Sequence, residues 1–147
     1  MKLYYTPGAC SLSPHIVLEE SGLPFELEKV DLQLKETASG HDFYLVNTKG
    51  SVPALELDDG QILTEGAVIV QYLADRVPEK GLIPVPGTMA RYRVMEWLNY
   101  IATELQKSFT PIFSFREQNF FLSSVFGSSS ASTSVNSFGV PSGRIKP

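Results

Sequence analysis

Apolar residues along this chain recur with clear periods as far as Phe113 and lose every period from Ser114 onward. Within the periodic part, alternating apolar and polar residues predict half-buried strands, whereas apolar residues three and four apart predict the buried face of a helix. The segments that fit the strand pattern are residues 2–5, 25–30, 52–57 and 61–63. The last two flank Asp58-Asp59-Gly60, and an Asp-Gly pair in that position predicts a hairpin.

The first helix has a predicted start and a predicted end. Ser13 directly precedes Pro14, and serine is a common cap while proline suits the first turn of a helix. Gly22 predicts the end, because glycine readily adopts the left-handed conformation that closes many helices. Residues 35–46 give a weaker pattern, from which we expect a short and irregular helix.

Two further helices are predicted after the hairpin. Thr64 is the expected cap of the first of them, with Glu65 in the first turn, where the helix dipole favours a negative charge. Residues 78–87 are rich in proline and glycine and are typical of a linker. A longer helix is predicted over residues 89–107, with an apolar face made by Val94, Trp97, Leu98, Ile101 and Leu105.

The predicted order β-α-β-α-β-β-α is that of a thioredoxin-like domain, in which a parallel βαβ unit is joined to an antiparallel hairpin. We therefore expect an α/β fold with a thioredoxin-like domain over residues 1–77 and a linker over residues 78–87. Residues 88–113 are predicted to form the first part of an incomplete all-α C-terminal domain.

The segment 114–147 has a different texture from the rest of the chain. It is rich in serine, and it shows neither a helical nor a strand period. Such a composition buries too little apolar surface to offset an ordering cost of about 1–2 kcal/mol per residue, so we predict disorder. Two explanations stay open at this stage, a native tail and a frameshifted reading frame.

Composition narrows the function classes. The chain has 147 residues, 43% of them hydrophobic, and a formal net charge of -4, a balance that argues against nucleic acid as the main partner. No apolar stretch approaches the roughly 20 residues that span a bilayer, and no signal-peptide pattern precedes the first strand, so we expect a cytoplasmic protein without a membrane partner. The one cysteine, Cys10, excludes an internal disulfide and a cysteine-rich metal site.

Cys10 follows Pro7-Gly8-Ala9 and comes just before the first predicted helix. A lone cysteine is most often a small buried apolar residue. At the N-terminal end of a helix, however, unpaired N–H groups and the helix dipole favour the thiolate, and the neighbouring Ser11 offers a hydroxyl donor. We therefore interpret Cys10 as a functional thiol. The absence of a second cysteine nearby argues against a dithiol oxidoreductase.

Two other segments have features that suit an extended peptide ligand. A cis bond at Val52-Pro53 would leave the Val52 backbone free to pair with such a ligand, whereas an ordinary turn proline would carry no function, and the sequence favours neither. Glu65-Gly66 opens a predicted helix, so Glu65 could hold an ammonium group while helix N–H groups hold a carboxylate. Dipole capping by Glu65 is the simpler explanation of that pair.

Taken together, these residues resemble the bacterial beta-class glutathione transferases. The resemblance extends over residues 1–113 and rests on five separated blocks in the right order: residues 2–13, 47–55, 63–66, 71–75 and 96–105. It implies that Cys10 lies against the sulfur of glutathione and can form a mixed disulfide with it. It implies further that Val52 hydrogen-bonds the cysteinyl backbone of glutathione next to a cis Pro53, and that Glu65 and Gly66 hold the γ-glutamyl group.

The resemblance also implies contacts from other elements. Lys35 would contact the glycyl carboxylate, and the long helix would contribute Asn99, Thr103, Glu104, Leu105 and Gln106, with Asn99 reaching across a dimer. Cys10, Ser11 and Lys107 are the implied catalytic residues, because they would stabilise charge on the thiolate. The family often has histidine where this sequence has Gln106, and glutamine cannot take up a proton.

The implied function is a homodimeric transferase that conjugates the glutathione thiolate to hydrophobic electrophiles, with glutathione as co-substrate, no metal, and Cys10-dependent glutathione disulfide chemistry. The alternative is a non-catalytic glutathione-binding or protein-interaction module. Family members have further helices that this sequence does not encode. We therefore expect Trp97, Ile101 and Leu105 to be partly exposed, the chain to be aggregation-prone or partner-dependent, and its activity to be impaired.

Overall fold

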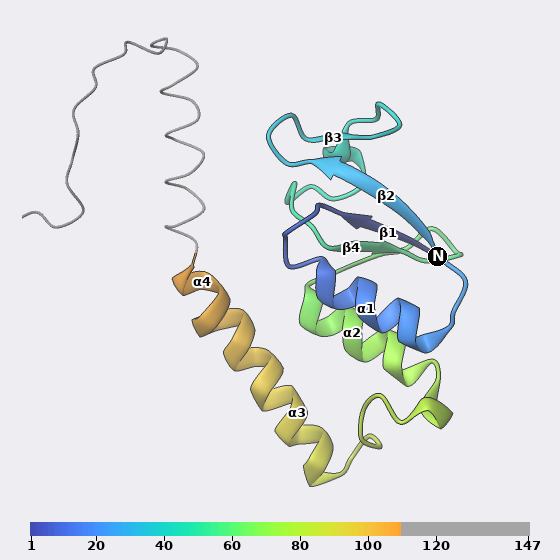
Figure 1. Cartoon of the computed structure of the whole chain (residues 1–147), viewed down its shortest axis with the longest axis vertical. Helices are drawn as coiled ribbons and strands as arrows, with labels where there is room; N and C mark the ends of the chain where they lie inside the picture. Colours follow the sequence, from blue (N-terminus) through green and yellow to red (C-terminus); the bar gives the residue numbers. More distant parts are fainter. Residues whose placement is uncertain (110–147) are drawn as a thin grey trace, which may run out of the picture. The chain divides into compact units, whose positions relative to one another are not determined.

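The computed structural model describes residues 1–109, which contain a mixed β-sheet (Figure 1). The strand order is β3-β2-β1-β4-β5. The strands are β1 (Lys2–Tyr5), β2 (Glu26–Asp31), β3 (Glu36–Thr37), β4 (Ala54–Glu56) and β5 (Ile62–Thr64). The β1–β2 pair is parallel, and the pairs β1–β4, β2–β3 and β4–β5 are antiparallel, which confirms the predicted thioredoxin-like α/β fold and its hairpin.

The two faces of the sheet have separate cores. The helices α1 (Leu12–Ser21) and α2 (Gly66–Asp75) lie side by side on one face (Figure 1). There they bury a cluster of Leu3, Leu18, Leu55, Ile69 and Leu73. The short 3-10 helix η1 (Phe43–Leu45) contributes to a second cluster of Tyr4, Val30, Phe43, Val52 and Ala54. Successive residues of a strand point to opposite faces, so Leu3 serves the first cluster and Tyr4 the second.

Both predicted helix caps are wrong, and Gly22 is confirmed as a helix end. The helix α1 begins at Leu12, so Ser13 lies inside it, and the N-cap position belongs to Ser11. Thr64 is the last residue of β5, and Glu65 takes the N-cap position of α2 with φ 70° and no side-chain cap bond. Gly22 closes α1 in the left-handed conformation at φ 69°.

The weakly patterned segment 35–46 contains the expected short helix in the form of η1, and also the short strand β3, which the sequence did not predict. Asp42 caps η1, because its Oδ1 accepts a hydrogen bond of 2.8 Å from the backbone N–H of Tyr44. The backbone N–H of Phe43 donates to the carbonyl of Lys35 at 2.8 Å. These two bonds give partners to backbone N–H groups at the start of η1, which a helix leaves without partners of its own.

The long predicted helix is interrupted. An α-helix, α3 (Met89–Tyr100), passes into a π-helical turn, η3 (Ile101–Leu105), and then into α4 (Gln106–Ser108). The linker before α3 holds the 3-10 helix η2 (Pro78–Lys80). Residues 1–107 form one compact unit, Ser108 begins a second, and the predicted disordered segment 114–147 lies outside the described residues. No helix within residues 1–109 is long and apolar enough to cross a membrane.

Arg91 ties α3 to α2. Its guanidinium donates two hydrogen bonds of 2.7 Å to the carboxylate of Asp75 and one of 3.2 Å to the carbonyl of Pro84. The Arg91 side chain is 9% exposed and that of Asp75 is 41% exposed. The hydrogen bonds from Arg91 hold the pKa of Asp75 below its ordinary value. The pair therefore fixes the start of α3 against the end of α2.

We expect Arg91→Met to lower the free energy of unfolding by about 1–2 kcal/mol, because charge-assisted hydrogen bonds are lost but Asp75 keeps access to water. Since a lowered carboxyl pKa stabilises the fold above its ordinary value of 3.8, the difference from the wild type should shrink as the pH falls below that value. Urea unfolding at neutral and acidic pH measures both effects. The control is Arg93→Met, since Arg93 pairs with Glu96 on the exposed face. An equal loss at both pH values would contradict the role of the ion pair.

Candidate functional site

Cys10 is exposed and lies in the loop between β1 and α1. Its thiol donates to the carbonyl oxygen of Val52, with 3.2 Å between Sγ and O. Ser11, by contrast, is buried, and its hydroxyl donates to the carbonyl of Thr6 at 3.2 Å while accepting from the Thr6 N–H at 3.2 Å. In this arrangement Ser11 closes the loop that carries Cys10, and its hydroxyl hydrogen is bonded to the Thr6 carbonyl.

The Val52-Pro53 peptide bond is cis, one of the two alternatives that the sequence left open. The carbonyl of Val52 receives the Cys10 thiol, while its backbone N–H has no hydrogen-bond partner within residues 1–109. The side chains of Val52 and Ala54 are buried in the core cluster around Phe43. Val52, two positions before β4 begins, thus combines a carbonyl that contacts the thiol with an N–H that is unpaired among the described residues.

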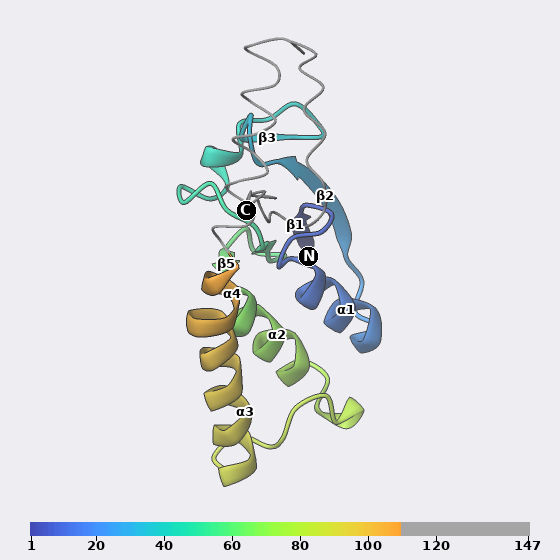
Figure 2. The same cartoon turned by 60° about the vertical axis from the view of Figure 1, so that its left-hand side comes forward.

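Glu65 and Gly66 follow β5 and begin α2, the helix that comes next to β5 in Figure 2. Because Ala54 of β4 pairs with Thr64 of β5, Val52 and Glu65 lie at the same end of these two strands. Glu65 has a positive φ of 70°, a conformation that is costly for a residue with a side chain and is found disproportionately at ligand sites. Gly66 lies close to Pro53, since a Cβ added to Gly66 would be 3.7 Å from Pro53 Cγ. The cis proline and the N-terminus of α2 are therefore neighbours.

Two lysines contact groups at the loop that leads into Val52, Lys35 from outside the loop and Lys49 from within it. The Nζ of Lys35 donates to the carbonyl of Gly50 at 2.9 Å. The Nζ of Lys49 pairs with Oε1 of Glu65 at 2.9 Å and donates to Oγ1 of Thr64 at 3.3 Å. Two cations thus stand beside the edge formed by Val52 and Glu65, which suits a ligand that carries carboxylates.

The predicted contacts on the long helix occupy η3, α4 and the end of α3. The side chains of Asn99, Thr103, Glu104, Leu105, Gln106 and Lys107 are all exposed. Thr103 Oγ1 donates to the carbonyl of Asn99 at 3.1 Å. On the same stretch, Trp97 is 62% and Ile101 45% exposed, and Leu105 is also exposed, which confirms the expectation of an open apolar face.

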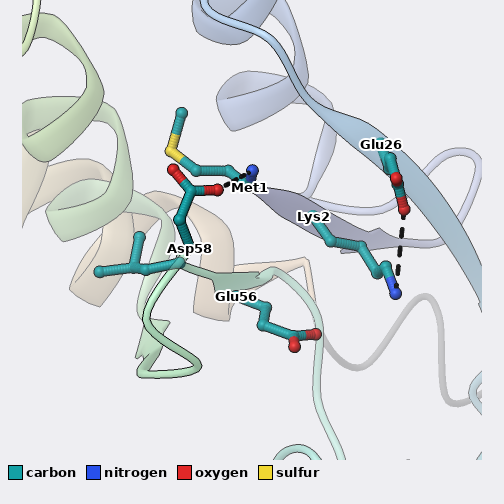
Figure 3. Close-up of a pocket in the computed structure, with 6 residues that line it drawn as sticks. Met1, Lys2, Glu26, Glu56 and Asp58 are labelled. Carbon is teal, nitrogen blue, oxygen red and sulfur yellow. Dashed lines mark hydrogen bonds and ion pairs between the residues drawn. The ribbon is translucent and has the colours of Figure 1, made fainter.

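A hollow at the other end of β1 has no part in this arrangement (Figure 3). Its charges are largely paired, with the Met1 amine 2.7 Å from Asp58 Oδ1 and Lys2 Nζ 3.9 Å from Glu26 Oε2. Glu56, also in its wall, accepts a hydrogen bond of 2.7 Å from the Tyr4 hydroxyl. Burial and this bond raise the pKa of Tyr4. Residues 1–109 contain no group of three His, Cys, Asp or Glu side chains that could hold a metal ion.

Sequence reasoning missed two residues that shape the site, Asn47 and Lys49. Asn47 is buried, and its amide donates to the carbonyl of Ser51 at 2.7 Å and accepts from the N–H of Lys49 at 3.1 Å. An asparagine that bonds the backbone two residues on is a frequent turn signal, and Asn47 precedes Gly50 by three residues. The turn was therefore open to prediction, but the pairing of Lys49 with Glu65 was not.

The described residues are similar to members of one protein family. Residues 8–76 match the family "Glutathione S-transferase, N-terminal domain". Glutathione S-transferase GstA of Escherichia coli O157:H7 is 58% identical over 113 residues, which are 77% of this chain and 56% of the relative.

Two solved structures are similar in sequence and fold. A sphingomonad glutathione S-transferase complexed with glutathione is 50% identical with a TM-score of 0.75, and the match covers 77% of this chain and 56% of that one. A beta-class glutathione S-transferase of Sphingomonas chungbukensis is 48% identical with a TM-score of 0.76 and the same coverage.

The chain spans little more than half the length of these relatives. Within that span, the matched family model, the sequence identities and the shared fold all indicate a glutathione S-transferase. Residues 8–76 therefore form the N-terminal domain of a glutathione S-transferase, and over the matched span the chain is similar to bacterial members of that family, one of them of the beta class.

Proposed function

We propose that this protein binds glutathione in an extended form along the edge formed by Val52 and Glu65, and that it acts as a glutathione transferase on hydrophobic electrophiles. The observation that carries the proposal is the 3.2 Å contact between Cys10 Sγ and the carbonyl of Val52. It brings a thiol to a backbone segment whose N–H is unpaired within residues 1–109. The glutathione complex of the sphingomonad relative supports this choice of ligand.

Each part of glutathione has a complementary group in the proposed complex. The cysteinyl backbone pairs with Val52 as a strand pairs with a sheet edge, which places the glutathione sulfur beside Cys10. The γ-glutamyl ammonium binds Glu65, and its carboxylate accepts from N–H groups at Gly66 and the start of α2. Lys35 lies on the side of the glycyl carboxylate.

The chemistry that we propose is attack by the glutathione thiolate on an electrophilic carbon, with Cys10 and Lys107 stabilising the negative sulfur. Ser11 keeps the Cys10 loop in place through its bonds to Thr6. Asn99 and the segment from Thr103 to Gln106 complete the site in a cytoplasmic homodimer. No step of this scheme requires a metal.

Cys10 also supports disulfide exchange. Its thiolate attacks one sulfur of glutathione disulfide, so that a Cys10–glutathione disulfide forms and one glutathione thiolate leaves. We expect the full chain to gain one glutathione when incubated with glutathione disulfide, and Cys10→Ala to gain none. Intact-mass spectrometry measures this directly. Modification of the alanine variant, or none of the wild type, would contradict it.

The transferase proposal is tested on the full 147-residue chain by retention on immobilised glutathione, followed by a conjugation assay with an aryl halide on the eluted protein. Retention with turnover supports a transferase. Retention without turnover supports the non-catalytic module, which the exposed apolar residues Trp97 and Ile101 would suit as a contact surface. Failure of both refutes a glutathione site in this chain.

A further inference from the structure

Lys49 is held in place by its own loop. Its backbone N–H donates to Oδ1 of Asn47, and the amide of that buried asparagine donates to the carbonyl of Ser51. The N–H of Gly50 also donates to the Asn47 carbonyl at 2.8 Å. These bonds close a tight turn over residues 47–51, and the turn directs the Lys49 side chain across to the start of α2.

The contact that results is an ion pair with the residue proposed to bind the ligand. Lys49 Nζ lies 2.9 Å from Glu65 Oε1 and 3.3 Å from Thr64 Oγ1, and the two charged side chains are 56% and 67% exposed. Glu65 is meanwhile held at a positive φ of 70° by the backbone, which restricts where its carboxylate can turn. The carboxylate that should receive an ammonium group already has one.

We propose that Lys49 is a specificity-determining residue that occupies the cation position at Glu65 until the α-ammonium group of a ligand displaces it. This inference rests on the proposed glutathione site and adds a competitor within it. Two ammonium groups beside one carboxylate repel each other, so ligand binding moves the Lys49 side chain into water. Lys49 therefore reduces the advantage that an α-ammonium group gives to a ligand.

A ligand without that ammonium group does not compete with Lys49 for Glu65. Glutaryl-cysteinyl-glycine has the shape of glutathione but lacks the amine, so it binds with the Lys49–Glu65 pair intact. If Lys49 were removed, the Glu65 carboxylate would have no cation beside it when glutaryl-cysteinyl-glycine binds. The same carboxylate would be free to bind the ammonium group of glutathione. The ratio of the two affinities thus reports on Lys49, and a purely structural role would leave that ratio unchanged.

The experiment compares the wild-type chain with Lys49→Met by calorimetric titration of glutathione and of glutaryl-cysteinyl-glycine. We expect Lys49→Met to raise the affinity ratio in favour of glutathione by about two- to fivefold, the range expected when an exposed ion pair is removed. Lys49→Arg keeps the ion pair and should leave the ratio near the wild-type value. Lys29→Met, on β2, removes one positive charge two strands away from β4 and should not change the ratio.

The outcomes separate this inference from the proposed function. If the wild type binds glutathione and Lys49→Met shows an unchanged or lower ratio, Lys49 does not compete for Glu65 and the inference is overturned alone. A ratio that rises equally in Lys29→Met would assign the effect to net charge and would also overturn it. If the wild type binds neither ligand, the glutathione site itself is refuted and the inference is overturned with it.

Discussion

Replacing Glu65 by alanine is expected to weaken glutathione binding by about tenfold to a hundredfold, because a hydrogen bond to a charged group contributes about 1.5–3 kcal/mol and part of that is offset by displacing Lys49. The carboxylate is the acceptor proposed for the γ-glutamyl ammonium, and Lys49 Nζ already lies 2.9 Å from it. Alanine removes the acceptor and leaves Lys49 as an unpaired cation. Titration calorimetry with reduced glutathione measures the loss.

Two controls separate binding from folding in this experiment. Glu65→Gln keeps the size and one acceptor oxygen, so its loss should be smaller than that of alanine. Glu79→Ala changes an exposed glutamate in η2 and should leave the affinity unchanged. Because Glu65 has a positive φ, all three variants need a thermal unfolding curve. Binding by a folded Glu65→Ala variant at the wild-type affinity would place the γ-glutamyl group elsewhere.

Replacing Phe43 by alanine is expected to lower the free energy of unfolding by about 3–5 kcal/mol, the range for removing a buried aromatic side chain. Phe43 is fully buried, and its ring centroid lies 5.6 Å from that of Tyr4. It shares a core cluster with Val30, Val52 and Ala54. Since small domains are stable by about 5–15 kcal/mol, this one change should unfold a large part of the sample on mild heating.

Phe43 also bears on the site, because Val52 packs in the same cluster. We therefore expect Phe43→Ala to weaken glutathione binding even under conditions where it stays folded. Denaturant unfolding measures the stability, with Phe43→Leu as a milder change and Leu45→Ala as the matched control. Leu45 lies in the same 3-10 helix but is 85% exposed, so its removal should cost less than about 0.5 kcal/mol. Equal losses for Phe43→Ala and Leu45→Ala would show that η1 does not cover a core.

The segment 35–46, which contains η1, shows where a hydrophobic pattern no longer predicts the structure. Apolar residues do not recur with a regular period in residues 35–46, and this segment forms a short strand and one turn of 3-10 helix. Phe43 is the apolar residue that matters there, and a single buried aromatic produces no period. The helix caps failed for a related reason. Ser11 and Ser13 can both cap a helix by residue type, but the Ser11 hydroxyl bonds the backbone of Thr6 and makes no cap bond to α1.

The candidate site was predicted in part. The importance of Cys10 followed from its place before a helix, and the roles of Val52, Glu65 and Lys35 followed from the family resemblance. The described structure places Cys10 next to Val52 and Gly66 next to Pro53, although the glutathione contacts themselves stay predictions. Lys49 was missed, because its partner Glu65 is sixteen residues away and no local rule joins them.

The sequence by itself determined the elements whose signals lie within a few residues, namely the strands β1, β2, β4 and β5, the Asp-Asp-Gly hairpin, the end of α1 at Gly22 and the lone thiol before α1. Only the tertiary structure decided which of these segments meet. The order β3-β2-β1-β4-β5 brings Cys10 to Val52 across 42 positions and Lys49 to Glu65. The physical reason is that turns and caps are satisfied by neighbouring backbone groups, whereas contacts between distant residues depend on how the sheet is assembled.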